Sequence, residues 1–291
     1  MNQLKLKQSI QVLFIILSCL MMIQCAGTKQ VSAKNQNIEF LIEQGKLHWE
    51  QRVDSLSLQK AEHFIGLACE QRPNDFELNV LLARLLYTKA LFLVTDQSTQ
   101  ESIFLEGSDI AKTAVISHPD FVPIYENAMG DGQFKLISAV MLAPQSVVTG
   151  LFWWATNLAR YLNTKPVIER LNHRELLEVI MHRIISIDPG YHYSGPYRFF
   201  GSLYTRIPGV ELSQSETYFN QALENHPEYL GNSVHMAEFY FQKSGDREKF
   251  HSTLQKVLST DISVFPTIIA ENIFYQDRAK ALLKKESSLF E

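Results

Sequence analysis

The stretch GPYRFFGSLYTRIPG, residues 195–209, decides between two very different folds for this chain. Its residues Tyr197, Phe200, Gly201 and Tyr204 follow the spacing i, i+3, i+4 and i+7, which places them on one face of a helix. Such a face either forms an aromatic ligand box or packs against the next helix of a repeat. The spacing matches the first-helix pattern of a tetratricopeptide repeat, W-x2-L-G-x2-Y. We therefore predict that Gly201 lies where two helices cross and that the aromatic rings belong to the repeat core.

Prolines spaced along the chain mark the ends of further helices. The segments EQRPND, SHPDF, SIDPGY and NHPEY place Pro73, Pro119, Pro189 and Pro227 directly after segments with helical periodicity. Because proline cannot continue a helix, we expect a helix to end within a few residues before each of them. An alanine stands five residues before three of these prolines, as in the second helix of a tetratricopeptide repeat.

The apolar periodicity predicts an all-α fold. Helical stripes recur at residues 59–71, 75–93, 173–187 and 214–224, and no segment sustains the alternation of a strand. The spacing between the prolines is longer than the repeat period of about 34 residues, so the repeats are degenerate. We predict a tetratricopeptide-like solenoid of helical hairpins over residues 38–291.

A hydrophobic segment at residues 128–165 interrupts the repeats and predicts an inserted, tryptophan-rich pair of helices. Between Phe134 and Leu162 the only charged residues are Lys135 and Arg160. A proline-led break, Pro-Gln-Ser at residues 144–146, divides this run, which argues against one transmembrane helix.

Two adjacent tryptophans make this insertion the candidate binding site. Neighbouring residues on a helix point about 100° apart, so one ring can face the core and the other a groove. Trp154 shares a helical stripe with Asn157 and Tyr161, so we expect Trp154 at a concave surface and Trp153 in the core. Asn157 and Arg160 would supply the polar groups of a mostly apolar lining. The alternative is a core helix with both tryptophans packed.

The N-terminus predicts an envelope protein. Lys5 and Lys7 precede a charge-free apolar run that ends in a cysteine, the pattern of a bacterial lipoprotein signal peptide. We expect residues 1–25 to be this signal peptide and the chain to be lipid-anchored, facing the periplasm. An ordinary cleaved signal or a signal anchor is the alternative.

Two cysteines compete for the lipid. Cys25 is favoured because polar residues 26–37, which read as a flexible tether, follow it directly. Cys19 is the alternative because a small residue precedes it, whereas Gln24 precedes Cys25 and departs from the lipoprotein pattern.

Composition and motifs point away from catalysis. The net charge is −4, with no concentration of basic residues of the kind that binds nucleic acid. The sequence contains no G-x-S-x-G, P-loop, H-E-x-x-H or C-x-x-C motif, so no catalytic residue, cofactor or metal site is predicted. Cys69, alone in an apolar stretch, reads as a core residue rather than a nucleophile. An unrecognised hydrolase is the alternative that a compact cluster of histidine, carboxylate and nucleophile would reveal.

Three stretches, in order, resemble the TRAP-transporter-associated T-component (TatT-like) lipoprotein family, whose members are built from degenerate tetratricopeptide repeats. They are GLFWWATNLARYLN at residues 150–163, the segment at 195–261 with its F-x-x-A-L-E-x-x-P motif, and ENIFYQDRAKALLKKESSLF at 271–290. Each motif alone is weak, and their order makes the match specific.

The resemblance implies a non-catalytic, envelope-tethered scaffold. Such a protein would bind the periplasmic solute-binding component of a TRAP transporter and help to pass it a small, apolar organic ligand. The resemblance leaves self-association into a homo-oligomer open. A general scaffold for envelope assembly, using the same concave repeat surface for another partner, is the alternative.

Overall fold

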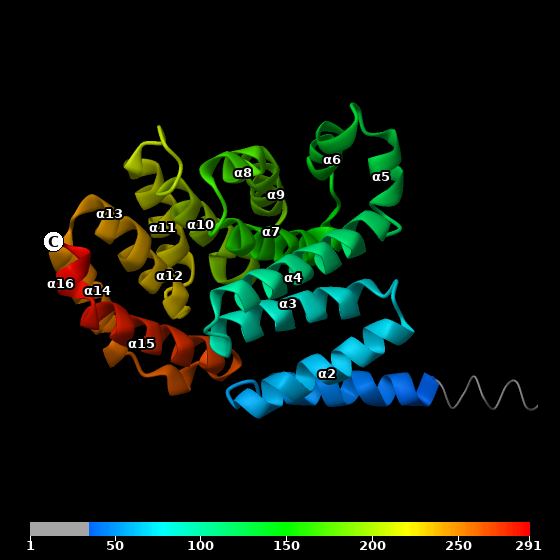
Figure 1. The fold of residues 1–291 in the computed structure, drawn as a ribbon, viewed down its shortest axis with the longest axis horizontal. Coiled ribbons are helices and arrows are strands. Elements are labelled where there is room, and N and C mark those ends of the chain that lie inside the picture. Colours follow the sequence, from blue (N-terminus) through cyan, green and yellow to red (C-terminus); the bar gives the residue numbers. More distant parts are fainter. Residues whose placement is uncertain (1–34) are drawn as a thin grey trace, which may run out of the picture.

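The computed structural model describes residues 35–291, which form helices and contain no β-strand (Figure 1). The all-α prediction is therefore confirmed. In chain order the elements are a helix at residues 35–50, α2 (Ser55–Gln71), α3 (Phe76–Phe92), α4 (Gln97–Ser117), α5 (Val122–Asn127), α6 (Gly132–Val140), η1 (Gln145–Val147), α7 (Val148–Leu162), α8 (Val167–Asn172), α9 (Arg174–Ile187), α10 (Tyr191–Tyr204), α11 (Leu212–Asn225), α12 (Leu230–His235), the π-helical η2 (Met236–Phe241), α13 (Gln242–Ser244), α14 (Arg247–Ser259), η3 (Ile262–Val264), η4 (Pro266–Ile268), α15 (Ile269–Lys284) and α16 (Glu286–Leu289).

Local sequence signals set both ends of these helices. Aspartates at the N-caps of α2, α3 and α4 each accept a hydrogen bond from a backbone N–H of the first turn, as Asp54 does from Ser57 at 2.8 Å. The helices α2, α4, α9 and α11 all end two residues before a proline, as predicted.

The stretch at residues 195–209 packs as a repeat core. Gly201 of α10 lies against Phe219 of α11, and a Cβ atom built on Gly201 would be 2.8 Å from the Phe219 ring. Phe200 is fully buried, with its ring centroid 4.9 Å from that of Tyr218. The prediction that Gly201 marks a helix crossing is confirmed, and the aromatic rings around it are core.

The tryptophan-rich insertion forms the centre of the largest hydrophobic cluster. Helix α7 packs against α3, α4 and α9, so neighbours cover it on several sides. Among residues 35–291 no single helix is long and apolar enough to cross a membrane. Helix α6 and the segment Gln145–Leu162 together have the length and composition of a membrane span, but this pair is bent by 113°.

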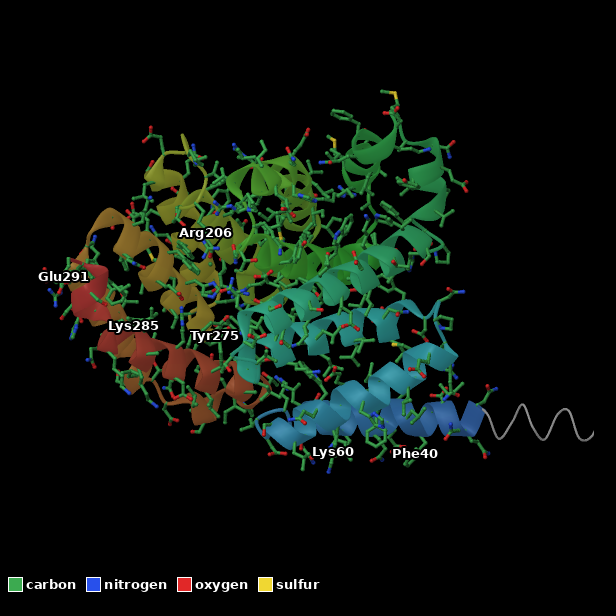
Figure 2. All side chains as sticks on the ribbon, viewed as in Figure 1. Phe40, Lys60, Arg206, Tyr275, Lys285 and Glu291 are labelled. Atoms are coloured by element: carbon green, nitrogen blue, oxygen red, sulfur yellow. The ribbon has the colours of Figure 1, made fainter. Side chains whose placement is uncertain are left out.

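The array of helices curves until its two ends meet. The Arg52 guanidinium, just before α2, donates to both carboxylate oxygens of Glu271 on α15, at 3.1 and 2.8 Å. Phe92 and Phe274 stack nearby, with ring centroids 4.7 Å apart. Figure 1 shows α15 returning to the side of α2 and α3. In Figure 2, Tyr275 lies on the inner side of this curve.

Several N-terminal predictions fall on residues outside the described part of the chain. These are the signal peptide at 1–25 with Cys19 and Cys25, and most of the tether at 26–37. The predicted tether is too long at its C-terminal end, because residues 35–37 already belong to the first helix. Ile38 and Leu41, both buried, hold that first turn against the core.

Candidate functional site

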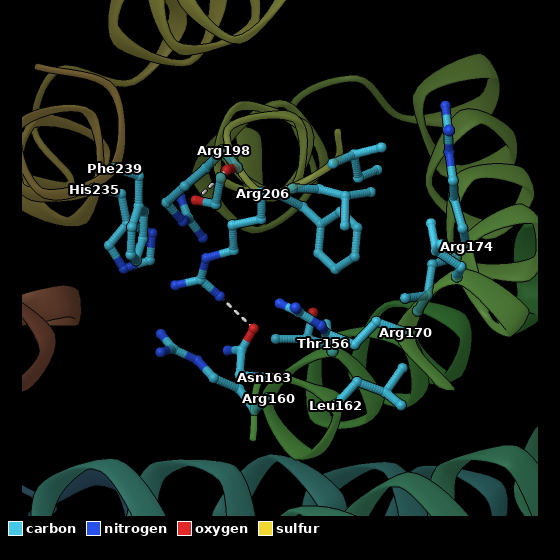
Figure 3. Close-up of a pocket in the computed structure, with 18 of the residues that line it drawn as sticks. Thr156, Arg160, Leu162, Asn163, Arg170, Arg174, Arg198, Arg206, His235 and Phe239 are labelled. Carbon is cyan, nitrogen blue, oxygen red and sulfur yellow. Dashed lines mark hydrogen bonds between the residues drawn. The ribbon is translucent and has the colours of Figure 1, made fainter. Parts of the chain in front are cut away.

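A cavity of about 130 Å³ opens between α7, α8, α9, α10 and the consecutive helices α12 and η2 (Figure 3). Its walls combine aromatic and aliphatic side chains with an unusual number of arginines. The lining residues are Tyr87, Phe152, Thr156, Ala159, Arg160, Leu162, Asn163, Val167, Arg170, Leu171, Arg174, Leu177, Gly195, Arg198, Phe199, Ser202, Leu203, Arg206, Ile207, Pro208, His235 and Phe239.

Helix α10 gives the cavity both of its chemical characters. Arg198 and Ser202 follow one another at a spacing of four residues, and Arg206 continues this polar row just beyond the helix end. Phe199 and Leu203 form an apolar row beside it. Residues four apart lie one above the other on a helix, so each row presents a continuous strip to the cavity.

The cavity is strongly cationic. Five arginines line it, and the lining includes no aspartate or glutamate. Arg174 is neutralised by Glu178 of its own helix, whose carboxylate lies 2.9 Å from the Arg174 Nε. Within residues 35–291, the other four arginines have no carboxylate within the 4.0 Å of an ion pair.

Three of these arginines donate to neutral groups instead. Arg160 donates to the Tyr87 hydroxyl at 3.3 Å, and Arg206 donates to the Asn163 side-chain oxygen. Arg198 donates to Asn232 at 2.7 Å and to a backbone carbonyl at 3.1 Å. These bonds position the guanidinium groups without cancelling their charge.

The concentration of positive charge shifts the pKa values of the groups around it. Partial withdrawal from water and, after it, the neighbouring Arg160 charge lower the pKa of Arg206 to about 10, although its side chain keeps an exposed part, so Arg206 stays protonated at neutral pH. Burial, followed by the charges of Arg160, Arg198 and Arg206, holds the pKa of His235 well below its ordinary value. His235 is therefore neutral at pH 7 and leaves the arginines as the cations of the cavity.

Polar atoms in the wall lack hydrogen-bond partners. Thr156 Oγ1, Arg170 Nε and His235 Nδ1 are each buried with no partner among the described residues. Buried polar atoms in native proteins are nearly always paired, so three unpaired atoms in one cavity indicate a place that water or a ligand fills.

A left-handed turn leads into this wall. His192, Tyr193 and Ser194 have φ values of 46°, 57° and 57°, in the region that residues other than glycine rarely adopt. The Tyr193 carbonyl accepts a hydrogen bond from Arg198, so the turn helps to position a cavity arginine. Three such residues in succession are costly and cluster at functional sites in other proteins.

The structure corrects the predicted roles of the two tryptophans. Trp154 is 1% exposed, so the prediction that it faces a groove is wrong. The two rings do diverge, but α4 covers the Trp154 side, with Lys112 Nζ 5.9 Å from the ring centroid. Trp153 is buried as predicted and packs against Tyr87, with ring centroids 5.5 Å apart.

Of the two tryptophans and the predicted groove residues Asn157, Arg160 and Tyr161, only Arg160 lines the cavity. Asn157 is fully buried and donates to the backbone carbonyls of Ala83 and Trp153, at 3.2 and 2.9 Å, which ties α7 to α3. Tyr161 is half-buried, with Lys165 Nζ 4.4 Å from its ring centroid. The stripe that was expected to line a groove is a contact between helices.

The residues of the site that were not predicted from the sequence include Arg170, Arg198, Arg206 and His235. A signal was present in the row Arg198-x3-Ser202-x3-Arg206, which runs through an otherwise aromatic repeat helix. Arg170 and His235 carry no comparable pattern, because the curvature of the whole array brings them to the cavity.

Elsewhere, the described residues contain no group of three or more histidines, cysteines or carboxylates placed to hold a metal. Cys69 is buried in the core as predicted, and burial raises the pKa of its thiol to about 12. A thiol with such a pKa is not an activated nucleophile.

A family model described as TRAP transporter T-component matches residues 69–290. The chain belongs to the TRAP transporter T-component family. A search of curated proteins finds no match. The T-component match covers the whole cavity wall, from α3 to η2, and the strained turn at residues 192–194 near the start of α10. Membership gives this T-component an accessory role in TRAP transport and a place in the bacterial envelope.

Proposed function

We propose that this T-component is a lipid-anchored, periplasm-facing accessory protein that binds the solute-binding component of its transporter and holds a small organic ligand in the cavity between α7 and α10. The observation that carries the proposal is the cavity itself, which lies within the family match. Its volume of about 130 Å³ is close to that of an engineered cavity of about 150 Å³ that binds benzene.

The composition of the wall supports ligand binding. Small-molecule sites combine apolar walls with a few converging polar groups, and here Phe199 and Leu203 alternate with Arg198 and Arg206. Arg160 of α7 lines the cavity, whereas Trp153 of the same helix is buried and packs against Tyr87.

Partner binding is tested by co-purification. The T-component is immobilised and mixed with a purified TRAP solute-binding protein from the same organism, with a solute-binding protein from an unrelated TRAP system as the control. We expect the protein from the same organism to be retained selectively. Retention of neither protein, or equal retention of both, contradicts the partner assignment.

The lipid anchor is tested by metabolic labelling with palmitate. We expect wild-type protein to be labelled and Cys25→Ala to lose the label, because Cys25 is followed by the polar tether. Loss of the label in Cys19→Ala alone would move the anchor to Cys19. A label that survives both substitutions together contradicts a lipid anchor on either cysteine.

A further inference from the structure

A cluster of exposed apolar side chains lies on and around the short helix α6, outside the cavity. Its members Met129, Phe134, Met141 and Leu142 are 82%, 69%, 59% and 65% exposed, and none of them lines the cavity between α7 and α10. Phe134, Met141 and Leu142 follow the spacing i, i+7 and i+8, so they lie on one side of the helix. We call these four residues the α6 tip. Apolar patches of this kind on a protein surface mark sites of contact with another protein or with a membrane.

The opposite face of α6 is already used for packing. Leu136, Ile137 and Val140 are buried in the largest hydrophobic cluster. Helix α6 is therefore apolar on both of its faces, and within residues 35–291 only one face is covered. A helix that is apolar all round belongs in a protein core or in lipid, so the outer face of α6 calls for an apolar neighbour.

The composition of the tip favours lipid over a protein partner. Residues 128–143 contain only two charges, Asp131 and Lys135. The Lys135 ammonium donates to the Glu126 carbonyl at 3.1 Å and lies 5.4 Å from the Tyr125 ring centroid, so it is held against α5. Protein interfaces concentrate their binding energy in tryptophan, tyrosine and arginine, and residues 128–143 contain none of the three.

We infer that the α6 tip contacts the surface of the lipid leaflet that holds the N-terminal anchor. The inference rests on the lipid anchor of the proposed function. Asn35, the first residue of the described chain, is only ten residues after Cys25, and ten residues span at most about 35 Å. The folded protein is therefore held beside the leaflet. In Figure 1, α5 and α6 lie towards the same end of the long axis as the start of the helix at residues 35–50.

Helix α8 extends the apolar edge. Val167, Ile168 and Leu171 are also large apolar side chains with exposed surface. The Gln133 side chain at the start of α6 donates to the Asn172 carbonyl at the end of α8, at 3.0 Å, so the two short helices adjoin. Together they offer the leaflet a surface built from two helices rather than from single side chains.

The experiment measures contact with lipid at single positions of the lipid-anchored full chain. The protein is placed in vesicles of phosphatidylethanolamine and phosphatidylglycerol, with or without lipid that carries a doxyl quencher high on its acyl chain. The fluorophore NBD is attached through Leu142→Cys on the tip or through Lys285→Cys, which lies near the C-terminus, towards the other end of the molecule (Figure 2). The native Cys69 is buried, and the pKa of its thiol is about 12, so the label reacts at the introduced cysteine.

We expect the doxyl lipid to quench NBD at position 142 at least about twofold more than at position 285, because apolar faces at a leaflet surface lie about 5–10 Å deep. Phe134→Asp should reduce quenching at position 142 by about half or more, because it puts a charge in the contact. The matched control is Phe40→Asp, at an aromatic residue that is 53% exposed on the first helix, and it should leave quenching at position 142 unchanged. Thermal unfolding confirms that both variants are folded.

Three results would overturn the inference. Equal quenching at positions 142 and 285 excludes a specific contact of the tip with lipid. A shift of NBD emission at position 142 without quenching, which appears only at higher protein concentration, assigns the tip to a second copy of the chain. The same shift on addition of the solute-binding protein assigns the tip to that partner. Palmitate labelling is measured separately, so a missing anchor is distinguishable from a tip that does not touch lipid.

Discussion

At the scale of single residues, the glycines show most directly how this fold depends on close contact. Gly201 and Gly66 both lie inside helices, yet a Cβ on Gly201 would meet the Phe219 ring at 2.8 Å, whereas a Cβ on Gly66 would meet nothing within 4 Å. The same substitution should therefore have opposite effects at the two positions.

We expect Gly201→Ala to lower the free energy of unfolding by about 1–3 kcal/mol, because it overpacks the contact between α10 and α11. Gly66→Ala should raise it by about 0.5–1 kcal/mol, because alanine favours the helix. Chemical denaturation of both variants measures the difference. Equal effects at the two sites would show that Gly201 is not a contact position.

At the scale of helices, the sequence determined which elements form but not which faces they cover. Periodicity and proline stops predicted α2, α3, α9 and α11 because these signals act within one segment. Helix α4 has none of the predicted stripes, and it forms because Asp96 caps its first turn and its apolar face packs on α3 and α7.

The candidate site was much less predictable for the same reason. Arg160 was found because it interrupts an apolar run, but the role of Trp154 depended on whether another helix covers its face. Stripes on one helix do not identify the neighbour, and α4 is that neighbour. The left-handed turn at residues 192–194 was equally hidden, since histidine, tyrosine and serine carry no preference for positive φ strong enough to predict it.

The buried position of Trp154 in α7 gives a direct test. We expect Trp154→Ala to lower the free energy of unfolding by about 3–5 kcal/mol, because it opens a large cavity between α7 and α4. The folded fraction should still retain the solute-binding component, since Trp154 does not line the cavity. A Trp154→Ala variant that is as stable as the wild type but binds less well would show that Trp154 is a binding residue and not a core residue.

At the scale of the whole molecule, the contact between Arg52 and Glu271 closes the array. Arg84 also approaches Glu271, at 3.9 Å, so one buried carboxylate serves two guanidinium groups. We expect Glu271→Ala to destabilise the protein by about 3–5 kcal/mol, because it leaves buried charge uncompensated. Thermal and urea unfolding measure this loss. Glu286→Ala, at an ion pair with the exposed Arg247, is the control and should cost at most about 1 kcal/mol.

The cationic interior also predicts how stability depends on pH. Burial and neighbouring arginine charges hold the pKa values of His192 and His235 well below the ordinary value, so both stay neutral in the folded protein while the unfolded chain takes up protons below about pH 6.5. The free energy of unfolding should therefore decrease as the pH decreases, by up to about 1.4 kcal/mol per pH unit for each histidine.

Urea unfolding between about pH 7.5 and about pH 5.5, an interval that brackets the ordinary histidine pKa of about 6.5, measures this slope. We expect His235→Gln to reduce the slope of the free energy of unfolding against pH by the contribution of one histidine. A free energy of unfolding that is constant over this interval, or that rises as the pH falls, would contradict neutral histidines beside the arginines.

Closure of the array affects how the protein can fold during its synthesis. An open solenoid can fold progressively, because each repeat contacts only its neighbours along the chain. Here Arg52 pairs with Glu271, 219 residues further along the chain. This ion pair cannot form until nearly the entire polypeptide has been synthesised. Contacts of such long range slow folding. The first hairpins of the nascent chain must therefore remain without this contact until the last long helix, α15, has been synthesised.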